Sequence, residues 1–300
     1  MQKLYKMEGF GRKMDVKEER NGILLTEMTH FSLFDTLECG QCFRWEAMAD
    51  GAYRGIARGK ILTLREIGGG QIRLEGVTAQ EYHAIWEEYF DLRREYGAIR
   101  EQLSGLDPIL ATAGAESPGI RILRQEPWEA LCSFIISANN NIPRIKEIIR
   151  RLCREFGEKL GEELYSFPSA EVLAGQTVET LAPLRCGFRA KYILDAAKKV
   201  AGGELNLEEI AALPLPEARA QLPSIYGVGD KVAECVLLFG MGRLDAFPLD
   251  VWMKRAMRTL FPGKTAEFFG EYAGLANQYI FFYARNHRLN DAGEFAGDKL

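Results

Sequence analysis

The chain has 300 residues, of which 47% are hydrophobic and 27% charged, and its formal net charge is −4. These values are typical of a soluble globular protein with a sizeable core, built as one large domain or two of ordinary size. No apolar run approaches 18 residues and no targeting signal is visible, so we expect a cytoplasmic protein with no membrane partner. Because the chain is acidic, any surface that binds nucleic acid must be local.

Six cysteines are spread along the chain, and their pattern does not indicate a metal centre. Cys39 and Cys42 have the spacing of a metal or redox pair, but no second pair or histidine partner completes such a site. Several of the cysteines lie within apolar helical patterns, where a free thiol behaves as a small hydrophobic group. We therefore predict no metal ligands and a reducing compartment.

The first quarter of the chain has the pattern of a small sheet. Residues 1–20 are charged and lack periodicity, which predicts a loose start. Short apolar runs separated by glycine-containing turns then predict antiparallel strands. We place them at about 22–25, 42–45, 53–57, 61–64 and 71–74. Helical spacing of apolar residues begins at residue 79 and continues to residue 92.

The remainder of the chain is mostly helical in pattern. Helices are predicted at about 127–136, 143–157, 170–174, 177–184, 190–201, 207–213, 216–222, 231–239, 251–260 and 265–284, and residues 106–117 are ambiguous. The fold class is therefore α+β, with an N-terminal antiparallel β-sheet domain at 1–118 and an all-helical region at 119–300. The hairpin of that region is predicted at about 216–240, and we expect the N-terminal and C-terminal helices to pack together.

One stretch, from Ile225 to Cys235, carries the strongest chemical signal. Gly227 and Gly229 can adopt positive φ and let the backbone approach a ligand closely. The free N–H groups at the start of the following helix form a seat for phosphate. Lys231 lies in the first turn of that helix, and Asp250 follows 19 positions later. This arrangement predicts a lysine nucleophile that acts on the backbone of a nucleic acid.

A simpler interpretation stands beside each of these features. On that interpretation Lys231 is a surface residue at a helix start, and Asp250 is only the N-cap of the helix that begins at Val251. Two basic clusters, at 144–155 and 185–199, are either solvated helix faces or parts of a binding surface. The local pattern leaves these alternatives open.

Several motifs between about residues 35 and 285 form one recognisable set. They are G-Q-C-F-R-W at 40–45, S-A-N-N-N-I-P-R-I at 137–145, G-F-R-A-K-Y at 187–192, G-V-G-D-K-V-A-E-C at 227–235, P-L-D-V at 248–251 and the helix that contains residues 272–281. Together they resemble the 8-oxoguanine DNA glycosylase/AP lyase branch of the helix–hairpin–helix DNA glycosylases. The resemblance covers nearly the whole chain.

The resemblance implies a bifunctional DNA repair enzyme. Such an enzyme excises 8-oxoguanine opposite cytosine from double-stranded DNA and cleaves the abasic strand by β-elimination. Lys231 would form the Schiff base, and Asp250 would stabilise the positive charge that develops on the sugar. A glycosylase that lacked an amine nucleophile would use water and leave the strand whole.

The resemblance also assigns residues to DNA binding. The lesion-base pocket would contain Gly40, Cys235, Phe281 and Asn277. The carbonyl of Gly40 would accept the hydrogen that 8-oxoguanine carries on N7, where guanine has a repelling lone pair. The remaining assignments are Asn139 and Phe188 for insertion into the duplex, Arg144 and Arg189 for the opposite base, and Gly227 and Gly229 for phosphate.

Two residues depart from the pattern of this branch. Tyr226 stands where the hairpin usually has proline, and Asn277 stands where eukaryotic members have a glutamine that reads the base edge, with Gln278 next to it. Because no cysteine follows Cys235, the iron–sulfur cluster of other helix–hairpin–helix glycosylases is not expected.

The resemblance implies no required cofactor, although relatives hold a structural cation at the hairpin through backbone carbonyls. We expect a monomer, associated with the nucleoid if the source is prokaryotic.

Two alternatives for the function remain at this point. One is the same chemistry on another damaged base. The other is a non-catalytic helix–hairpin–helix module that binds duplex DNA, which would not need the pair of Lys231 and Asp250.

Overall fold

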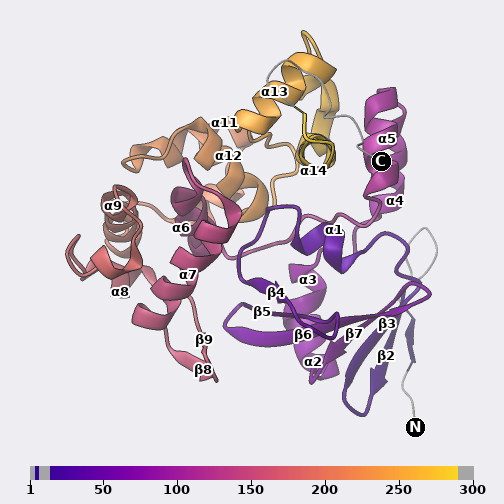
Figure 1. Ribbon diagram of the computed structural model, residues 1–300, viewed down its shortest axis with the longest axis horizontal. Coiled ribbons are helices and arrows are strands. Elements are labelled where there is room, and N and C mark those ends of the chain that lie inside the picture. The colour runs from indigo at the N-terminus through magenta and orange to yellow at the C-terminus, as the bar shows by residue number, and fades with distance from the viewer. Residues whose placement is uncertain (1–3, 7–13, 290–300) are drawn as a thin grey trace.

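The computed structural model describes residues 4–6 and 14–289. A seven-stranded antiparallel sheet is followed by a helical region, which confirms the α+β fold class (Figure 1). The strand order is β1-β2-β3-β7-β6-β5-β4. The strands are β1 (Leu4–Lys6), β2 (Asp15–Glu19), β3 (Gly22–Thr26), β4 (Trp45–Ala47), β5 (Tyr53–Ala57), β6 (Lys60–Gly68) and β7 (Gln71–Glu75).

Helices account for most of the rest of the described chain. The N-terminal part contains α1 (Leu33–Leu37), the continuous segment α2, η1 and α3 (Ala79–Glu81, Tyr82–Trp86 and Glu87–Tyr89), α4 (Tyr96–Ser104) and α5 (Pro108–Glu116). The helical region contains α6 (Pro127–Ser137), α7 (Ile142–Phe156), α8 (Ala170–Ala174), η2 (Ala182–Leu184), α9 (Arg189–Ala201), α10 (Leu207–Ala212), α11 (Leu215–Gln221), η3 (Leu222–Ser224), α12 (Asp230–Phe239), α13 (Val251–Leu260), η4 (Ala266–Tyr272) and α14 (Ala273–Asn286). A two-stranded hairpin, β8 (Lys159–Gly161) and β9 (Leu164–Tyr165), follows α7.

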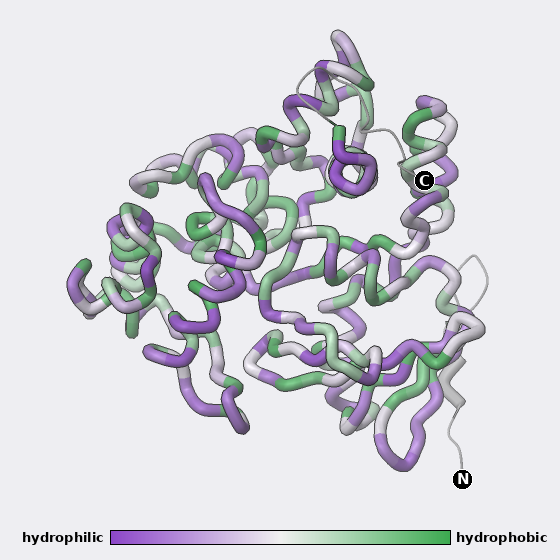
Figure 2. Tube along the Cα trace, viewed as in Figure 1, coloured by the Kyte–Doolittle hydropathy of each residue, from purple (hydrophilic) through white to green (hydrophobic). Residues whose placement is uncertain are grey.

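Two hydrophobic clusters stabilise the fold. The first lies between the sheet and the helical segment 79–89, where Trp45, Tyr82 and Trp86 are buried. The second joins α6, α12 and α14 and also includes residues of α4 and α5, because α5 packs against α14. Hydrophobic stretches lie on the strands and on the central helices (Figure 2). No helix among residues 4–6 and 14–289 combines the length and apolarity needed to cross a membrane.

The structure corrects three predicted elements, and in addition β4 begins at Trp45, three residues after the start of the strand expected at 42–45. Part of the expected loose start is strand β2, which pairs with β3 along its length. Only Val16 of its five residues is buried, so the sequence of β2 lacks the alternation of apolar and polar residues that would predict a strand. The helix predicted at 177–184 is a turn followed by η2. The hydroxyl oxygens of Thr177 and Thr180 each accept a hydrogen bond from the backbone N–H of the other residue, which favours the turn. Residues 1–3 and 7–13 of the expected loose start lie outside the described residues.

The third correction concerns the helix predicted at 265–284. Gly270 has φ +66° and ψ −148°, so the chain bends there and forms η4 and α14 in place of one helix. Apolar residues continue on both sides of the bend, which explains why periodicity alone suggested one element. Helices α1 and α4 were not predicted, and α1 has only five residues.

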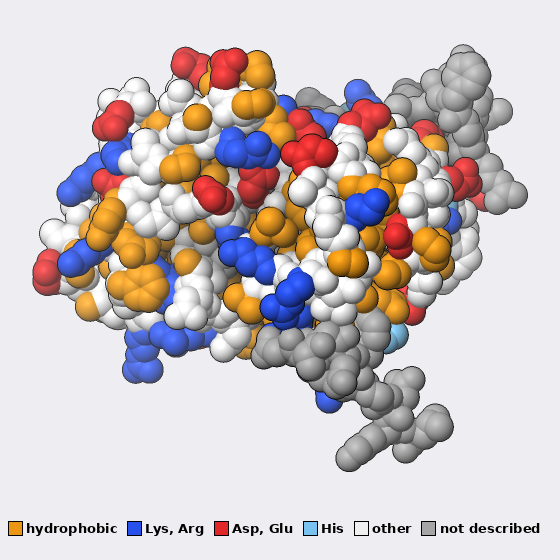
Figure 3. Space-filling model, turned by 90° about the horizontal axis from the view of Figure 1, so that it is seen from above, with side chains coloured by type: hydrophobic (Ala, Val, Ile, Leu, Met, Phe, Trp, Pro, Cys, Tyr) orange, Lys and Arg blue, Asp and Glu red, His pale blue; other side chains and the backbone are white. Residues whose placement is uncertain are grey.

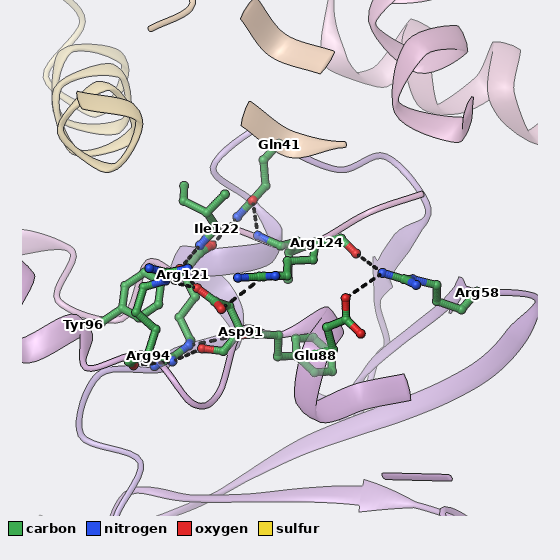
Figure 4. A network of polar contacts seen from close by, with 11 residues as sticks. Gln41, Arg58, Glu88, Asp91, Arg94, Tyr96, Arg121, Ile122 and Arg124 are labelled. Atoms are coloured by element: carbon green, nitrogen blue, oxygen red, sulfur yellow. Dashed lines mark hydrogen bonds and ion pairs between the residues drawn. The ribbon is translucent and has the colours of Figure 1, made fainter. Parts of the chain in front are cut away.

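A buried polar network joins the sheet domain to the helical region (Figure 4). The guanidinium of Arg121 donates to the carbonyl oxygens of Phe90, Asp91 and Arg94 and lies 4.1 Å from the ring centroid of Tyr96. The amide of Gln41 donates to the Arg121 carbonyl at 2.7 Å. The network therefore fixes the position of the turn next to Gln41, which contains Gly40.

Candidate active site

The hairpin between η3 and α12 has two glycines with different structural roles. Gly227 has φ +82°, and a Cβ atom there would come within 2.3 Å of the Tyr192 ring. Gly229 has an ordinary φ of −100°, so only Gly227 needs the positive φ expected from the sequence. A Cβ atom at Gly229 would meet no described atom within 4 Å. The hairpin thus leaves open space beside the N-terminus of α12, where free N–H groups favour an anion.

Lys231 lies in the first turn of α12 and its side chain is partly buried. Its Nζ donates a hydrogen bond to the Ser137 Oγ at 2.9 Å and lies 5.3 Å from the centroid of the Phe134 ring. The Ser137 hydroxyl itself donates to the Phe134 carbonyl at 2.7 Å. The Ser137 oxygen is therefore oriented to accept from Lys231, and the lysine nitrogen is held at the end of α6.

Asp250 is the N-cap of α13, as the sequence suggested. Its Oδ1 accepts a hydrogen bond from the Met253 N–H at 2.8 Å. The second carboxylate oxygen has no hydrogen bond to a described residue. Capping uses one oxygen and leaves the other available, so the cap and a catalytic role are compatible.

Lys231 and Asp250 line one small cavity of about 60 Å³. Four other predicted pocket residues line the same cavity, namely Gly40, Cys235, Asn277 and Phe281. Burial raises the pKa of the Cys235 thiol to about 11, although the neighbouring Lys231 opposes the shift. Pockets for drug-sized ligands are typically about 300–1,000 Å³. The cavity must therefore widen before it can hold a purine.

Gly40 lies in a turn that contacts the C-terminal helix. It has φ +88°, and a Cβ atom built on it would lie 3.4 Å from Phe281 Cε1 and 3.8 Å from Arg285 Nη1. Arg285 donates to the carbonyl oxygen of Glu38 at 2.7 Å, so α14 holds this turn from one side. From the other side Gln41, which is fully buried, donates to the Thr36 carbonyl at 2.8 Å. These contacts determine the position of the Gly40 carbonyl.

The structure distinguishes the two neighbouring amides of α14. Asn277 donates from Nδ2 to the Pro248 carbonyl at 2.8 Å, which ties α14 to the segment before Asp250. Gln278 is only 4% exposed and also lines the cavity, and its Oε1 has no hydrogen-bond partner among the described residues. The amide donor of Asn277 is thus engaged within the protein, whereas Gln278 has an unused acceptor.

Three of the residues predicted to contact the duplex are on the surface. Asn139 has φ +51° at the exposed turn between α6 and α7, and Arg144 is exposed in the first turn of α7. Phe188 is 51% exposed immediately before α9. Acidic and basic side chains are mixed on the face shown in Figure 3, in agreement with the net charge of −4. Any recognition of DNA must therefore depend on local groups of this kind.

Arg189 is placed differently from the other predicted contact residues. It is only 4% exposed, and its guanidinium donates to the carbonyl oxygens of Ala138, Asn139 and Cys186. Burial, and then the charge of Arg144, lower its pKa. Four hydrogen bonds use four of the five N–H groups of an arginine. Arg189 therefore anchors the Asn139 turn and retains one N–H for another partner.

Two residues next to the site were missed by the interpretation of the sequence. Ser137 holds the nitrogen of Lys231, and Gln41 fixes the turn of Gly40. Both lie inside motif segments that the sequence had already singled out, so their position in those segments was the available signal. No group of three or more His, Cys, Asp or Glu side chains that could hold a metal occurs in the described ranges.

Two family models match adjacent parts of the chain. A model described as 8-oxoguanine DNA glycosylase, N-terminal domain, matches residues 23–131. A model described as HhH-GPD superfamily base excision DNA repair protein matches residues 132–267. The second match contains the hairpin, Lys231 and Asp250.

Relatives of the chain have related names. It is 30% identical to the N-glycosylase/DNA lyase OGG1 of Arabidopsis thaliana over 282 residues, which are 84% of this chain and 77% of the relative. It is 39% identical to the N-glycosylase/DNA lyase of Saccharomyces cerevisiae over 160 residues, which are 48% of this chain and 43% of the yeast protein. The match thus spans less than half of the yeast relative.

Solved structures agree with these matches. The 8-oxoguanine glycosylase/lyase of Clostridium acetobutylicum, in complex with double-stranded DNA containing cytosine opposite to 8-oxoG, superposes with a TM-score of 0.87 and 40% identity over 91% of this chain and 98% of that chain. MBOgg1 in complex with a low-affinity DNA ligand gives a TM-score of 0.87 and 42% identity over 91% of this chain and 99% of that chain. The chain therefore belongs to the 8-oxoguanine DNA glycosylase/lyase family of DNA repair enzymes and is a DNA N-glycosylase and abasic-site lyase.

Proposed function

We propose that this enzyme excises 8-oxoguanine from duplex DNA and then cuts the abasic strand through a Schiff base on Lys231. The observation that carries the proposal is the shared cavity in which Lys231 and Asp250 face Gly40 and Phe281. A module that only binds phosphate has no use for a partly buried amine and a carboxylate that line one cavity. The same cavity offers a backbone carbonyl and an aromatic ring for a flipped base.

Recognition begins when the damaged nucleotide leaves the base stack, at a cost of roughly a few kcal/mol. Phe281 stacks on one face of the base and Cys235 lies against the other. The Gly40 carbonyl accepts the N7 hydrogen of 8-oxoguanine and repels the N7 lone pair of guanine. Because the cavity is about 60 Å³, we expect it to widen when the base enters.

The chemistry takes place at C1′ of the deoxyribose. The Lys231 nitrogen forms a bond to C1′ as the bond from C1′ to the base breaks. The bonding electrons leave with the base, which takes up a proton, and the nitrogen loses one. Asp250 stabilises the positive charge on the sugar. Opening of the C1′–O4′ bond gives the Schiff base, and loss of a C2′ proton then expels the 3′ phosphate.

The opposite base is read by exposed arginine. Arg144 is free to approach the edge of cytosine, and Arg189 adds its remaining N–H from behind the Asn139 turn. Asn139 and Phe188 fill the space left in the duplex.

The steps need only an amine, a carboxylate and transferred protons, so no cofactor is required, and the hairpin carbonyls remain the proposed place for a structural cation. We also propose that the enzyme works as a monomer.

Strand cleavage of labelled duplexes tests the proposal. The duplexes carry 8-oxoguanine opposite each of the four bases, guanine opposite cytosine, or 3-methyladenine. We expect cleavage without added alkali, greatest with 8-oxoguanine opposite cytosine and absent with guanine. Arg144→Ala should reduce the preference for cytosine. Preferential cleavage of the 3-methyladenine duplex would instead favour the alternative of another damaged base. A relative from Bacillus subtilis that is 27% identical is named DNA-3-methyladenine glycosylase.

A further inference from the structure

Tyr226 is an exposed aromatic residue at the tip of the hairpin that precedes α12. Its side chain is 62% exposed, and among the Phe, Tyr and Trp side chains of the described ranges it is the most exposed. Its hydroxyl has no hydrogen-bond partner among those residues. Proline, which the family resemblance leads one to expect here, has neither an aromatic ring nor a hydroxyl. The position therefore carries a chemical group that the phosphate seat itself does not explain.

The backbone of Tyr226 is fixed from behind by α9. The Tyr226 N–H donates to the Asp195 carboxylate at 2.7 Å, and Lys199 forms an ion pair with Asp195 at 3.0 Å. Lys199 also donates to the carbonyl of Ser224, two residues before the tyrosine. Because α9 holds the backbone at both Ser224 and Tyr226, the exposed ring extends from a fixed segment of backbone.

The ring of Tyr226 is part of a row of three aromatic side chains. Its centroid lies 5.0 Å from that of Tyr192 at an interplanar angle of 86°, and the Tyr192 centroid lies 5.6 Å from that of Phe188. Such edge-to-face pairs restrain ring orientation. Tyr192 also packs beneath Gly227, so one ring supports both the hairpin and the residue proposed to enter the duplex.

We propose that Tyr226 is an additional DNA contact, next to the hairpin glycines and at the other end of the aromatic row from Phe188. Its ring packs against a deoxyribose, and its hydroxyl donates to a phosphate oxygen of the strand that the hairpin holds. The inference rests on the proposed binding of duplex DNA by this face. A single duplex that engages both the hairpin and Phe188 must run along this row of rings, and Tyr226 is the exposed ring at the hairpin end of the row.

The contact is tested by equilibrium binding to a duplex that carries a stable abasic-site analogue, over a range of salt concentrations. Tyr226→Phe removes only the hydroxyl, and Tyr226→Ala removes the ring as well. A hydrogen bond to a charged group is worth at least about tenfold in affinity, so we expect about that loss for Tyr226→Phe and a larger loss for Tyr226→Ala. A neutral hydrogen-bond donor releases no counterion from the DNA, so the slope of the logarithm of affinity against the logarithm of salt concentration should not change.

A matched control is Ile67→Ala, which truncates another exposed hydrophobic side chain, in strand β6. It should bind like the wild type, and all variants should melt at the wild-type temperature. Wild-type affinity for both Tyr226 variants would overturn the inference, and wild-type affinity for Tyr226→Phe alone would overturn the phosphate contact. The abasic analogue contains no damaged base, so this binding test does not depend on the identity of the lesion. Weakened binding would therefore support the contact even if the wild-type enzyme failed to excise 8-oxoguanine. Such a failure would count only against the proposed function.

Discussion

The Lys231 nitrogen lies 2.9 Å from the hydroxyl oxygen of Ser137, and that hydroxyl donates its own hydrogen to the carbonyl of Phe134. The two residues come from different helices, α12 and α6, so the hydrogen bond also joins the helix of Lys231 to the helix that leads to Asn139. Because an amine can donate to Ser137 and still present its lone pair to the cavity, the hydrogen bond to Ser137 is compatible with the attack proposed for Lys231.

We predict that Ser137→Ala slows base excision about tenfold, because one orienting hydrogen bond is lost. The affinity for the lesion duplex should not change, since Ser137 is not assigned a DNA contact. Single-turnover excision and equilibrium binding measure the two quantities separately. Ser137→Thr retains the hydroxyl and serves as the matched control. An equal loss in both variants, or a loss confined to binding, would contradict the orienting role.

Asp250→Asn separates capping from catalysis. Asparagine caps a helix about as well as aspartate, so the melting temperature should stay within a few degrees of the wild type. The negative charge that we propose faces the sugar is lost, and we expect excision to slow by about 10² or more, by analogy with other preorganised electrostatic groups. Thermal unfolding and single-turnover kinetics check both outcomes. A near-normal rate would reduce Asp250 to a helix cap.

Gln41→Leu tests whether the Gly40 turn must be held in place. The substitution leaves the carbonyls of Thr36 and Arg121 without their amide donor, at a cost of about 1–3 kcal/mol for each buried group. Excision of 8-oxoguanine should fall relative to cleavage of a preformed abasic site, because only the first reaction uses the proposed contact of the Gly40 carbonyl with the base.

The control for this variant is Leu64→Ala in the sheet core, which should also cost about 2–5 kcal/mol. It should leave the ratio of the two activities unchanged at a temperature where both variants are folded. If both variants changed the ratio equally, the effect of Gln41 would be one of stability alone.

The Cys235 thiol makes stability depend on pH in the alkaline range. Burial raises its pKa from 9.0 to about 11, so the folded protein holds this proton more tightly than the unfolded chain does. Its contribution to stability is complete below about pH 9 and is lost as the pH rises towards 11. Between pH 9 and 11 the melting temperature of the wild type should therefore fall relative to that of Cys235→Ala, which has no thiol to ionise. If the difference between the two melting temperatures stayed constant over this range, the thiol would have the same pKa in the folded and the unfolded chain, which would contradict the prediction.

The sequence predicted well those elements that have a strong period or a local signal. Helix α13 lies at 251–260 as expected, and α7 begins one residue before its predicted start, because Pro143 and a long apolar stripe mark it clearly. Strand β2 could not be predicted, since four of its five side chains are not buried and its pairing with β3 supplies the order.

The same division applies to the site. Lys231, Asp250 and Gly40 lie in short motifs, so each could be singled out from its neighbours, and the structure brings them together around one cavity. The hydrogen bonds from Arg189 to Ala138 and Asn139 join segments that are remote in the sequence, and no local pattern encodes them. For the same reason the engaged amide of Asn277 could not be foreseen, because its partner Pro248 belongs to another element.

The domain boundary at residue 118 stays a prediction. Helices α4 and α5 precede it in sequence and yet pack with the helical cluster through α14. The extended segment 120–125 that follows is tied to both parts by Arg121 and Gln41. Limited proteolysis followed by mass spectrometry would locate the boundary, and cleavage between α3 and α4 would place it before residue 96.

Borohydride trapping on a duplex with one 8-oxoguanine opposite cytosine tests the central claim most directly, because reduction converts the Schiff base into a stable covalent adduct. We predict an adduct on this duplex and on an abasic duplex but not on an undamaged G·C duplex. Lys231→Gln should form none while it still binds the lesion duplex. A wild-type adduct on the abasic duplex alone would contradict 8-oxoguanine as the substrate, and an adduct that persists in Lys231→Gln would contradict the assignment of the nucleophile.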